Sequence, residues 1–112
     1  MEEFDIAIIG GGPAGIMAAI AASADLNIVL LEKNSSLGSK LLITGGGRCN
    51  ITNEKPIKKL LNSFHDKNFL KHSFYTFTNE MLLDLFRNRG LDFIVEDNNR
   101  VFPETEKSQD IL

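Results

Sequence analysis

A glycine-rich turn near the start of the chain most constrains how this sequence can fold. Residues 4–9 (FDIAII) form a short apolar run rich in β-branched residues, which is typical of a buried strand in a parallel sheet. The run ends at GGGPAG, residues 10–15, which matches the pattern G-x-G-x-x-G. Residues 16–23 are alanine-rich and favour a helix, and residues 27–31 form a second apolar run. Together these segments predict a strand–helix–strand unit of about 30 residues.

Each glycine of this turn has a predicted physical role. Gly10 permits a tight turn, Gly12 lets the backbone approach a diphosphate, and Gly15 lets the helix pack closely on the strand. The helix that begins near Pro13 directs unpaired N–H groups and the positive end of its dipole toward the same place. The turn therefore predicts a diphosphate-binding site, and a plain glycine-rich turn without a ligand is the alternative.

Glu32 strengthens this interpretation, because it ends the second apolar run about 20 residues after the turn. A carboxylate at this position can accept hydrogen bonds from both ribose hydroxyls of an adenosine. It also repels a 2′-phosphate, so the predicted ligand is FAD or NAD rather than NADP. The sequence thus predicts an α/β fold with a Rossmann-like FAD/NAD(P)-binding unit at its amino-terminal end.

Length and charge limit the remaining possibilities. The 112 residues suit one small domain and fall short of a two-domain oxidoreductase, so we expect an incomplete Rossmann-like domain. The net charge of −3 predicts neither nucleic acid nor a membrane as a partner. The single cysteine, Cys49, cannot form an intrachain disulfide, and the short apolar opening is no signal sequence, so we expect a cytoplasmic protein. No metal site is predicted, since His65 and His72 have no second ligand at metal spacing.

The rest of the chain predicts a long loop, three helices and a β-hairpin. Residues 33–53 are loop-like. The apolar spacing in residues 57–64 and 68–75 predicts two helices, and Thr78 is a plausible N-cap for a third that ends before Gly90. Residues 91–103 read as two short strands about a polar turn at residues 97–99.

A second glycine-rich segment, KLLITGGGRCNITN at residues 40–53, is the most unusual stretch of the chain. It combines three consecutive glycines, one arginine and several short amide or hydroxyl side chains, which suits wrapping around a polar cofactor. Cys49 lies within it, but a redox role is disfavoured because flavoproteins that exchange disulfides use a cysteine pair.

Three blocks of the sequence resemble the BaiN/YhiN-type family of NAD(P)/FAD-dependent oxidoreductases, some of which are called aminoacetone oxidase-like. The blocks are IIGGGPAG (residues 8–15), GSKLLITGGGRCNITN (residues 38–53) and NRVFPETEKS (residues 99–108). The first block is shared by many flavoproteins, and the second is quite specific to this family. Family members have roughly 400 residues, more than one domain's usual size. The resemblance therefore implies that residues 1–112 are the amino-terminal part of an FAD-binding domain, without the inserted domain.

The resemblance also assigns cofactor-binding residues. It places the glycine turn at the diphosphate, Glu32 at the adenosine ribose, and the second glycine segment along the cofactor. Arg48 is the cation expected to meet phosphate or the charge of reduced flavin, and a half-solvated loop arginine is the alternative. The expected cofactor-binding residues are Gly10, Gly12, Pro13, Ala14, Gly15, Glu32, Lys33, Lys40, Thr44, Gly45, Gly46, Gly47, Arg48, Cys49 and Asn50.

The leading functional hypothesis is a flavin-dependent oxidoreductase that transfers hydride through FAD, with a small-molecule substrate left unassigned. NAD(P)H is a candidate electron donor, and no side chain is nominated as a catalyst. Two alternatives stay open. The chain could be a non-catalytic, truncated nucleotide-binding fragment with exposed apolar faces, or an NAD-binding domain without flavin. The glycine segment at residues 40–53 argues against the second alternative.

Overall fold

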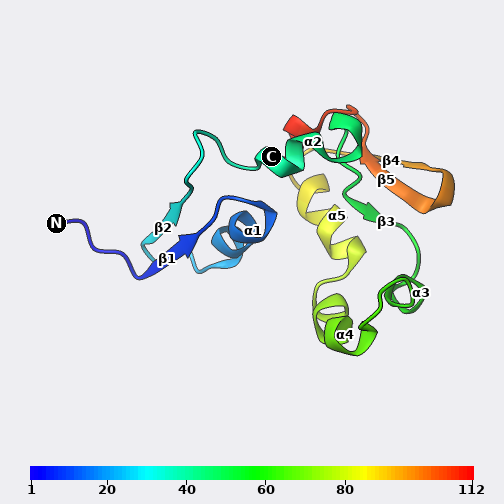
Figure 1. The fold of residues 1–112 in the computed structure, drawn as a ribbon, viewed down its shortest axis with the longest axis horizontal. Coiled ribbons are helices and arrows are strands. Elements are labelled where there is room, and N and C mark those ends of the chain that lie inside the picture. The colour runs from blue at the N-terminus through cyan, green and yellow to red at the C-terminus, as the bar shows by residue number, and fades with distance from the viewer.

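The computed structural model describes all 112 residues and shows two regions side by side (Figure 1). The first region contains strand β1 (Ile6–Ile9), helix α1 (Pro13–Ala21) and strand β2 (Ile28–Leu31). The strands pair in parallel, with Ile6 opposite Ile28 and Ile9 opposite Leu31. Because α1 connects two parallel neighbours, this region confirms the predicted βαβ unit.

The second region follows β2 and carries most of the helices (Figure 1). Its elements are, in order, α2 (Ser39–Ile43), the 3₁₀ turn η1 (Thr44–Gly47), β3 (Thr52–Asn53), α3 (Ile57–Leu61), α4 (Lys67–Thr76), α5 (Asn79–Arg87), β4 (Phe93–Glu96), the 3₁₀ turn η2 (Asp97–Asn99), β5 (Arg100–Pro103) and the 3₁₀ turn η3 (Ser108–Asp110).

An antiparallel sheet of order β3-β5-β4 organises the second region. The β4–β5 hairpin pairs Phe93 with Pro103 and Glu96 with Arg100, which confirms the predicted hairpin and its polar turn. Strand β3 pairs Thr52 with Val101. The expectation of a plain loop over residues 33–53 was wrong, because α2, η1 and β3 all lie within it. These elements are too short to leave a periodic signal, and β3 forms only through its pairing with distant β5.

Helices α3, α4 and α5 form where the sequence predicts helices, although α3 ends at Leu61, three residues before the predicted Phe64. The Thr78 hydroxyl accepts a hydrogen bond from the N–H of Met81 at 3.2 Å, which confirms Thr78 as the N-cap of α5. Asp66 caps α4 in the same way, with 3.1 Å from its carboxylate oxygen to the nitrogen of Phe69. Between them, α3 and α4 are joined by an edge-to-face contact of Phe64 with Phe74, whose ring centroids are 5.3 Å apart.

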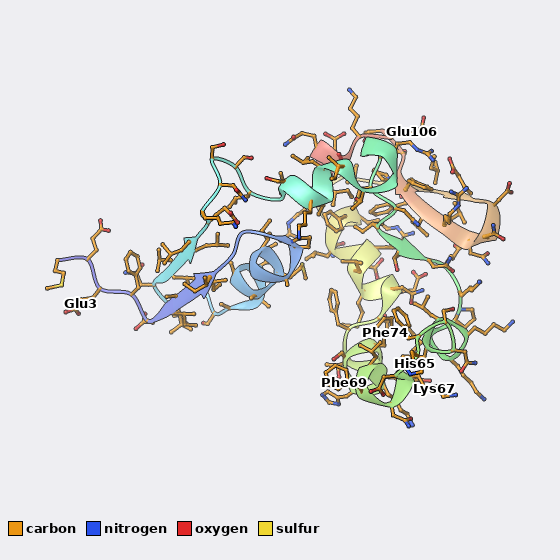
Figure 2. All side chains as sticks on the ribbon, viewed as in Figure 1. Glu3, His65, Lys67, Phe69, Phe74 and Glu106 are labelled. Atoms are coloured by element: carbon orange, nitrogen blue, oxygen red, sulfur yellow. The ribbon has the colours of Figure 1, made fainter.

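The buried core lies in the second region. The buried apolar side chains all come after residue 48, and they are Cys49, Leu61, Leu83, Val101, Phe102, Pro103 and Ile111. In contrast, no side chain of α1 is buried, and Ile9 of β1 is 79% exposed. Side chains also project freely from the outer helices, as Phe69 of α4 does (Figure 2). None of the helices has both the length and the apolar character required to cross a membrane.

Candidate functional site

The glycine turn joins the carboxyl end of β1 to the start of α1. Gly12 is the N-cap of α1, no side chain caps this end, and Pro13 occupies the first turn. A Cβ atom added at Gly12 would meet nothing within 4 Å, so open space lies in front of the helix terminus. A Cβ at Gly15 would instead collide with the carbonyl oxygen of Gly10. The turn therefore presents unpaired N–H groups to an accessible volume, which is a suitable arrangement for binding an anion.

Glu32 lies directly beside this turn, in the first position after β2. One carboxylate oxygen accepts a hydrogen bond from the N–H of Gly11 and the other accepts one from the N–H of Asn34, both at 2.8 Å. These two backbone bonds, that of Asn34 first, lower the pKa of Glu32, and the neighbouring Lys33 adds a smaller effect in the same direction. An ionised carboxylate that can accept further hydrogen bonds thus lies next to the helix terminus.

The second glycine segment forms a tight, closed loop in the structure. The N–H of Cys49 donates to the carbonyl of Thr44 at 3.0 Å, and the Thr44 hydroxyl donates to the carbonyl of Leu41 at 2.7 Å. Gly45 has a φ of +56°, and a Cβ there would lie 2.7 Å from the nitrogen of Asn50. Glycine is therefore required at this position for both conformation and space.

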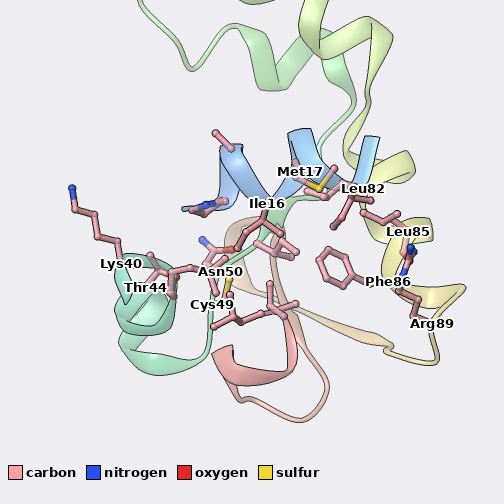
Figure 3. A pocket seen from close by; sticks show the side chains of 17 residues that line it. Ile16, Met17, Lys40, Thr44, Cys49, Asn50, Leu82, Leu85, Phe86 and Arg89 are labelled. Carbon is pink, nitrogen blue, oxygen red and sulfur yellow. Dashed lines mark hydrogen bonds between the residues drawn. The ribbon is translucent and has the colours of Figure 1, made fainter. Parts of the chain in front are cut away.

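The two glycine segments meet at a cavity of about 540 Å³ (Figure 3). Six of the residues predicted to bind the cofactor line it, and they are Pro13, Ala14, Lys40, Thr44, Cys49 and Asn50. Helices α1 and α5 supply apolar walls through residues such as Met17, Leu82 and Phe86, and Arg89 lies at the rim (Figure 3). The cavity has the size of a small-molecule site and a mostly apolar lining with a few polar groups.

The remaining predicted residues lie outside this lining. Gly10, Gly12, Gly15, Glu32 and Lys33 lie at or beside the glycine turn, whereas Gly45, Gly46, Gly47 and Arg48 belong to the loop but do not line the cavity. The turn and the loop lie at opposite ends of α2. Just before α2, the N–H of Gly38 donates a backbone hydrogen bond of 2.8 Å to the carbonyl of Gly11 in the turn, and the loop follows α2 directly.

Arg48 is engaged by two carboxylates of the second region. Its guanidinium forms a two-pronged contact with Glu96, at 2.7 and 3.2 Å, and a further bond to Glu106 at 3.0 Å. These bonds raise the pKa of Arg48, and the guanidinium lowers the pKa of Glu96. The ring of Phe102 lies beneath the guanidinium, 4.0 Å from centroid to Cζ. The partners of Arg48 in the structure are therefore protein groups.

Cys49 is buried and unpaired. Burial raises the pKa of its thiol, which keeps it protonated and lowers its nucleophilicity. The structure contains no group of three or more His, Cys, Asp or Glu side chains placed to hold a metal ion.

Several residues that shape the site were missed by the sequence analysis. Gly11 occupies a variable position of G-x-G-x-x-G, yet it donates to Glu32, and a Cβ added there would displace the end of the Leu37 side chain. The run of three glycines was the available signal. Glu96 and Glu106 were missed because their contact with Arg48 joins residues 48 and 58 positions apart, which no local pattern records.

A parallel βαβ unit with a glycine turn, an uncapped helix terminus and a carboxylate after the second strand defines the Rossmann class of nucleotide-binding domains. Comparison with known proteins agrees with this class. The chain belongs to the HI0933-like protein family, whose Rossmann domain matches residues 4–112. This match confirms the family resemblance and the fold class that the sequence predicted.

Relatives with known roles share this segment. The chain is 34% identical to a 3-dehydro-bile acid delta(4,6)-reductase of Clostridium scindens over 96% of its own length and 26% of the relative. It is 33% identical to the ribosomal RNA dihydrouridine synthase of Escherichia coli, over 97% of the chain and 27% of the relative. A mitochondrial dihydrolipoyl dehydrogenase of Caenorhabditis elegans is 39% identical over 65% of the chain and 13% of the relative. The chain thus spans about a quarter of the length of the first two relatives.

Proposed function

We propose that residues 1–112 form the amino-terminal part of an FAD-binding domain in a flavin-dependent oxidoreductase. Two observations carry this proposal: Glu32 accepts a hydrogen bond from Gly11 in the turn before α1, and Pro13 and Ala14 of that turn share a cavity with Lys40, Thr44, Cys49 and Asn50. The names of the relatives support it, since they describe a reductase, a dihydrouridine synthase and a dehydrogenase.

The residues fit the ADP half of FAD. The start of α1 presents N–H groups to open space at Gly12, which would bind the diphosphate without a lysine. The ionised Glu32 carboxylate would accept hydrogen bonds from the ribose hydroxyls, with Lys33 beside it. Because the pKa of Glu32 is lowered by its backbone partners, it stays charged at neutral pH and disfavours a 2′-phosphate.

The glycine loop fits the remainder of the cofactor. Thr44 and Asn50 offer a hydroxyl and an amide at the cavity, Lys40 lies at its edge, and α1 and α5 supply apolar walls. When bound, FAD supplies hydride transfer at its isoalloxazine ring. We assign no catalytic side chain to the chain itself, and NAD(P)H is the electron donor that we propose.

The substrate is not part of the proposal. One family relative is named for a bile acid and another for ribosomal RNA, so the family accommodates chemically different substrates. We propose a cytoplasmic location, which suits a chain with one cysteine and no disulfide.

A titration of the purified chain with FAD tests the proposal. Saturable quenching of flavin fluorescence and competition by ADP are the expected results, because the ADP half makes the contacts described above. The test variant is Gly12→Ala, whose Cβ would meet no protein atom within 4 Å but would occupy the space in front of the helix terminus, and which should weaken FAD binding by about tenfold, or about 1.4 kcal/mol.

Two outcomes separate the alternatives. Equal affinity for NAD and FAD, with ADP competing against both, would favour an NAD-binding domain without flavin. Because the chain spans about a quarter of its relatives, the same titration is made on the longest protein that the gene encodes. Absence of flavin binding from both proteins would refute the proposal.

A further inference from the structure

A cluster of charged and aromatic groups outside the cavity lining contacts the glycine loop through Arg48. Arg48 lies over Phe102 and contacts Glu96 and Glu106, and none of these four residues lines the cavity. Arg100 joins the edge of the cluster, 3.6 Å from Glu96. We refer to Arg48, Glu96, Glu106 and Phe102 as the Arg48 latch.

Hydrogen bonds and stacking hold the guanidinium of Arg48 in one orientation. The planar guanidinium uses two nitrogens against the two oxygens of Glu96, an arrangement that specifies orientation as well as attraction. Its face is stacked on Phe102, which is itself only 1% exposed. The side chains of Arg48 and Glu96 are 31% and 30% exposed, so water screens their attraction only in part.

The latch acts on the part of the loop that faces the cavity. Cys49, next to Arg48, has a φ of +59°, a conformation that a residue with a side chain adopts only when its surroundings impose it. On the far side, the N–H of Ile51 donates to the carbonyl of Val101 at 3.0 Å. Arg48 and Ile51 therefore attach the loop to β5 at two points, and Cys49 and Asn50 between them are directed to the cavity.

We propose that Arg48 is a positioning residue, which Glu96 and Glu106 hold so that residues 44–50 keep the conformation that receives the cofactor. It acts through the loop and does not contact the cofactor's phosphates. The expected loss of FAD binding rests on the proposed function. The expected loosening of residues 44–50 does not require any ligand.

Glu96→Gln separates this role from direct phosphate binding, because the two roles predict opposite changes. If Arg48 positions the loop, removing the charge of Glu96 weakens the latch and weakens FAD binding by about tenfold, as Arg48→Gln does. If Arg48 binds phosphate directly, the same substitution frees a cation and removes a nearby negative charge, so FAD binding stays equal or becomes tighter.

The experiment compares Arg48→Gln, Glu96→Gln, their double variant and Glu104→Gln as a matched control. Glu104 is exposed, lies in the same segment as Glu106 and forms no ion pair, so its variant removes an equal charge without touching the latch. The measurements are the Kd for FAD by fluorescence quenching and the hydrogen exchange of the Cys49 and Ile51 amides. We expect both single variants to lose about tenfold in affinity, the double variant to lose no more than either, and Glu104→Gln to match the wild type.

The exchange measurement keeps the two proposals distinct. Faster exchange of the Cys49 and Ile51 amides in both single variants, with the rest of the sheet protected, supports the latch even if the wild-type chain binds no FAD. Unchanged exchange in both variants, or tighter FAD binding by Glu96→Gln, would overturn it. Arg48→Lys guards against a folding defect, because it keeps the charge and loses the two-pronged contact; wild-type exchange and affinity in this variant would also overturn the latch.

Discussion

The βαβ region and the region that follows Ser39 differ in what they contribute. The first carries the glycine turn and Glu32, yet it buries no apolar side chain, and Ile9 and Leu31 are 79% and 50% exposed. The second carries the buried side chains around Val101 and Phe102. The residues that suggest the function and the residues that hold the structure together are therefore largely separate.

Helix α1 shows why the first region depends on its surroundings. Its sequence, PAGIMAAIA, contains no charged residue, and a helix that is apolar on all sides is normally buried on all sides. One side packs on the strands through Gly15, and the opposite side forms the cavity wall with α5. A parallel sheet also normally has both faces covered, whereas β1 and β2 are covered by α1 on one face. Helix α1 and the sheet of β1 and β2 therefore have apolar surfaces that the βαβ unit does not bury by itself.

Truncating one side chain in each region gives the largest expected contrast. Phe102→Ala removes a side chain that is 1% exposed and should lower the free energy of unfolding by about 3–5 kcal/mol. Ile9→Ala in β1 should cost about 1 kcal/mol or less, because that side chain is already in water. Urea unfolding followed by circular dichroism measures both. Equal losses in the free energy of unfolding would mean that β1 shares a core with the second region, and the proposed difference between the two regions would be wrong.

A methyl group added inside the βαβ unit should disturb that region alone. Gly15→Ala would normally favour a helix, but its Cβ would collide with the carbonyl oxygen of Gly10, so α1 must move away from β1 at a cost of about 1–3 kcal/mol. Hydrogen exchange should accelerate in residues 6–21, while residues 93–103 stay protected. Gly12→Ala is the control, since it meets nothing within 4 Å and should leave exchange unchanged.

A matched pair in the glycine loop tests how firmly the second region holds it. Gly45 and Gly46 both have positive φ, so alanine at either should cost about 1–2 kcal/mol of strain. Only Gly45 is also crowded, by the nitrogen of Asn50 at 2.7 Å and the Phe102 ring at 3.1 Å. We expect Gly45→Ala to lower the free energy of unfolding by about 1 kcal/mol more than Gly46→Ala. Equal values would show that the loop shifts away from Phe102 without resistance.

The sequence predicted the local parts of this molecule and missed the distant ones. Strand, glycine turn, helix and Glu32 lie within one short stretch, and Thr78 caps α5 from the position next to it, so their patterns are visible in order. In contrast, β3 and the partners of Arg48 depend on residues about 50 positions away, and α2 is only five residues long. The cavity was also out of reach, because it needs α1 and α5 to face one another.

The smallest expected effect concerns the charge of Glu32. Its pKa is lowered in the folded chain by hydrogen bonds from Asn34 and Gly11, so its contribution to the turn is present above the ordinary pKa of a glutamate. That contribution is lost as the pH falls through the lowered folded pKa, when the protonated carboxyl no longer accepts both bonds strongly. Exchange-detected protection of the Gly11 amide, corrected for intrinsic pH dependence, should therefore decrease at acid pH.

Glu32→Gln provides the matched comparison for this titration. The variant keeps one carbonyl acceptor and cannot ionise, so protection of Gly11 should be lower at neutral pH and should no longer change as the pH falls. Glu2→Gln removes an exposed carboxylate near the same end of the chain and should retain the wild-type profile. A wild-type profile in Glu32→Gln would mean that the βαβ region holds its turn without this carboxylate. The only role left for Glu32 would then be toward a ligand, which would make the division between functional and structural residues sharper still.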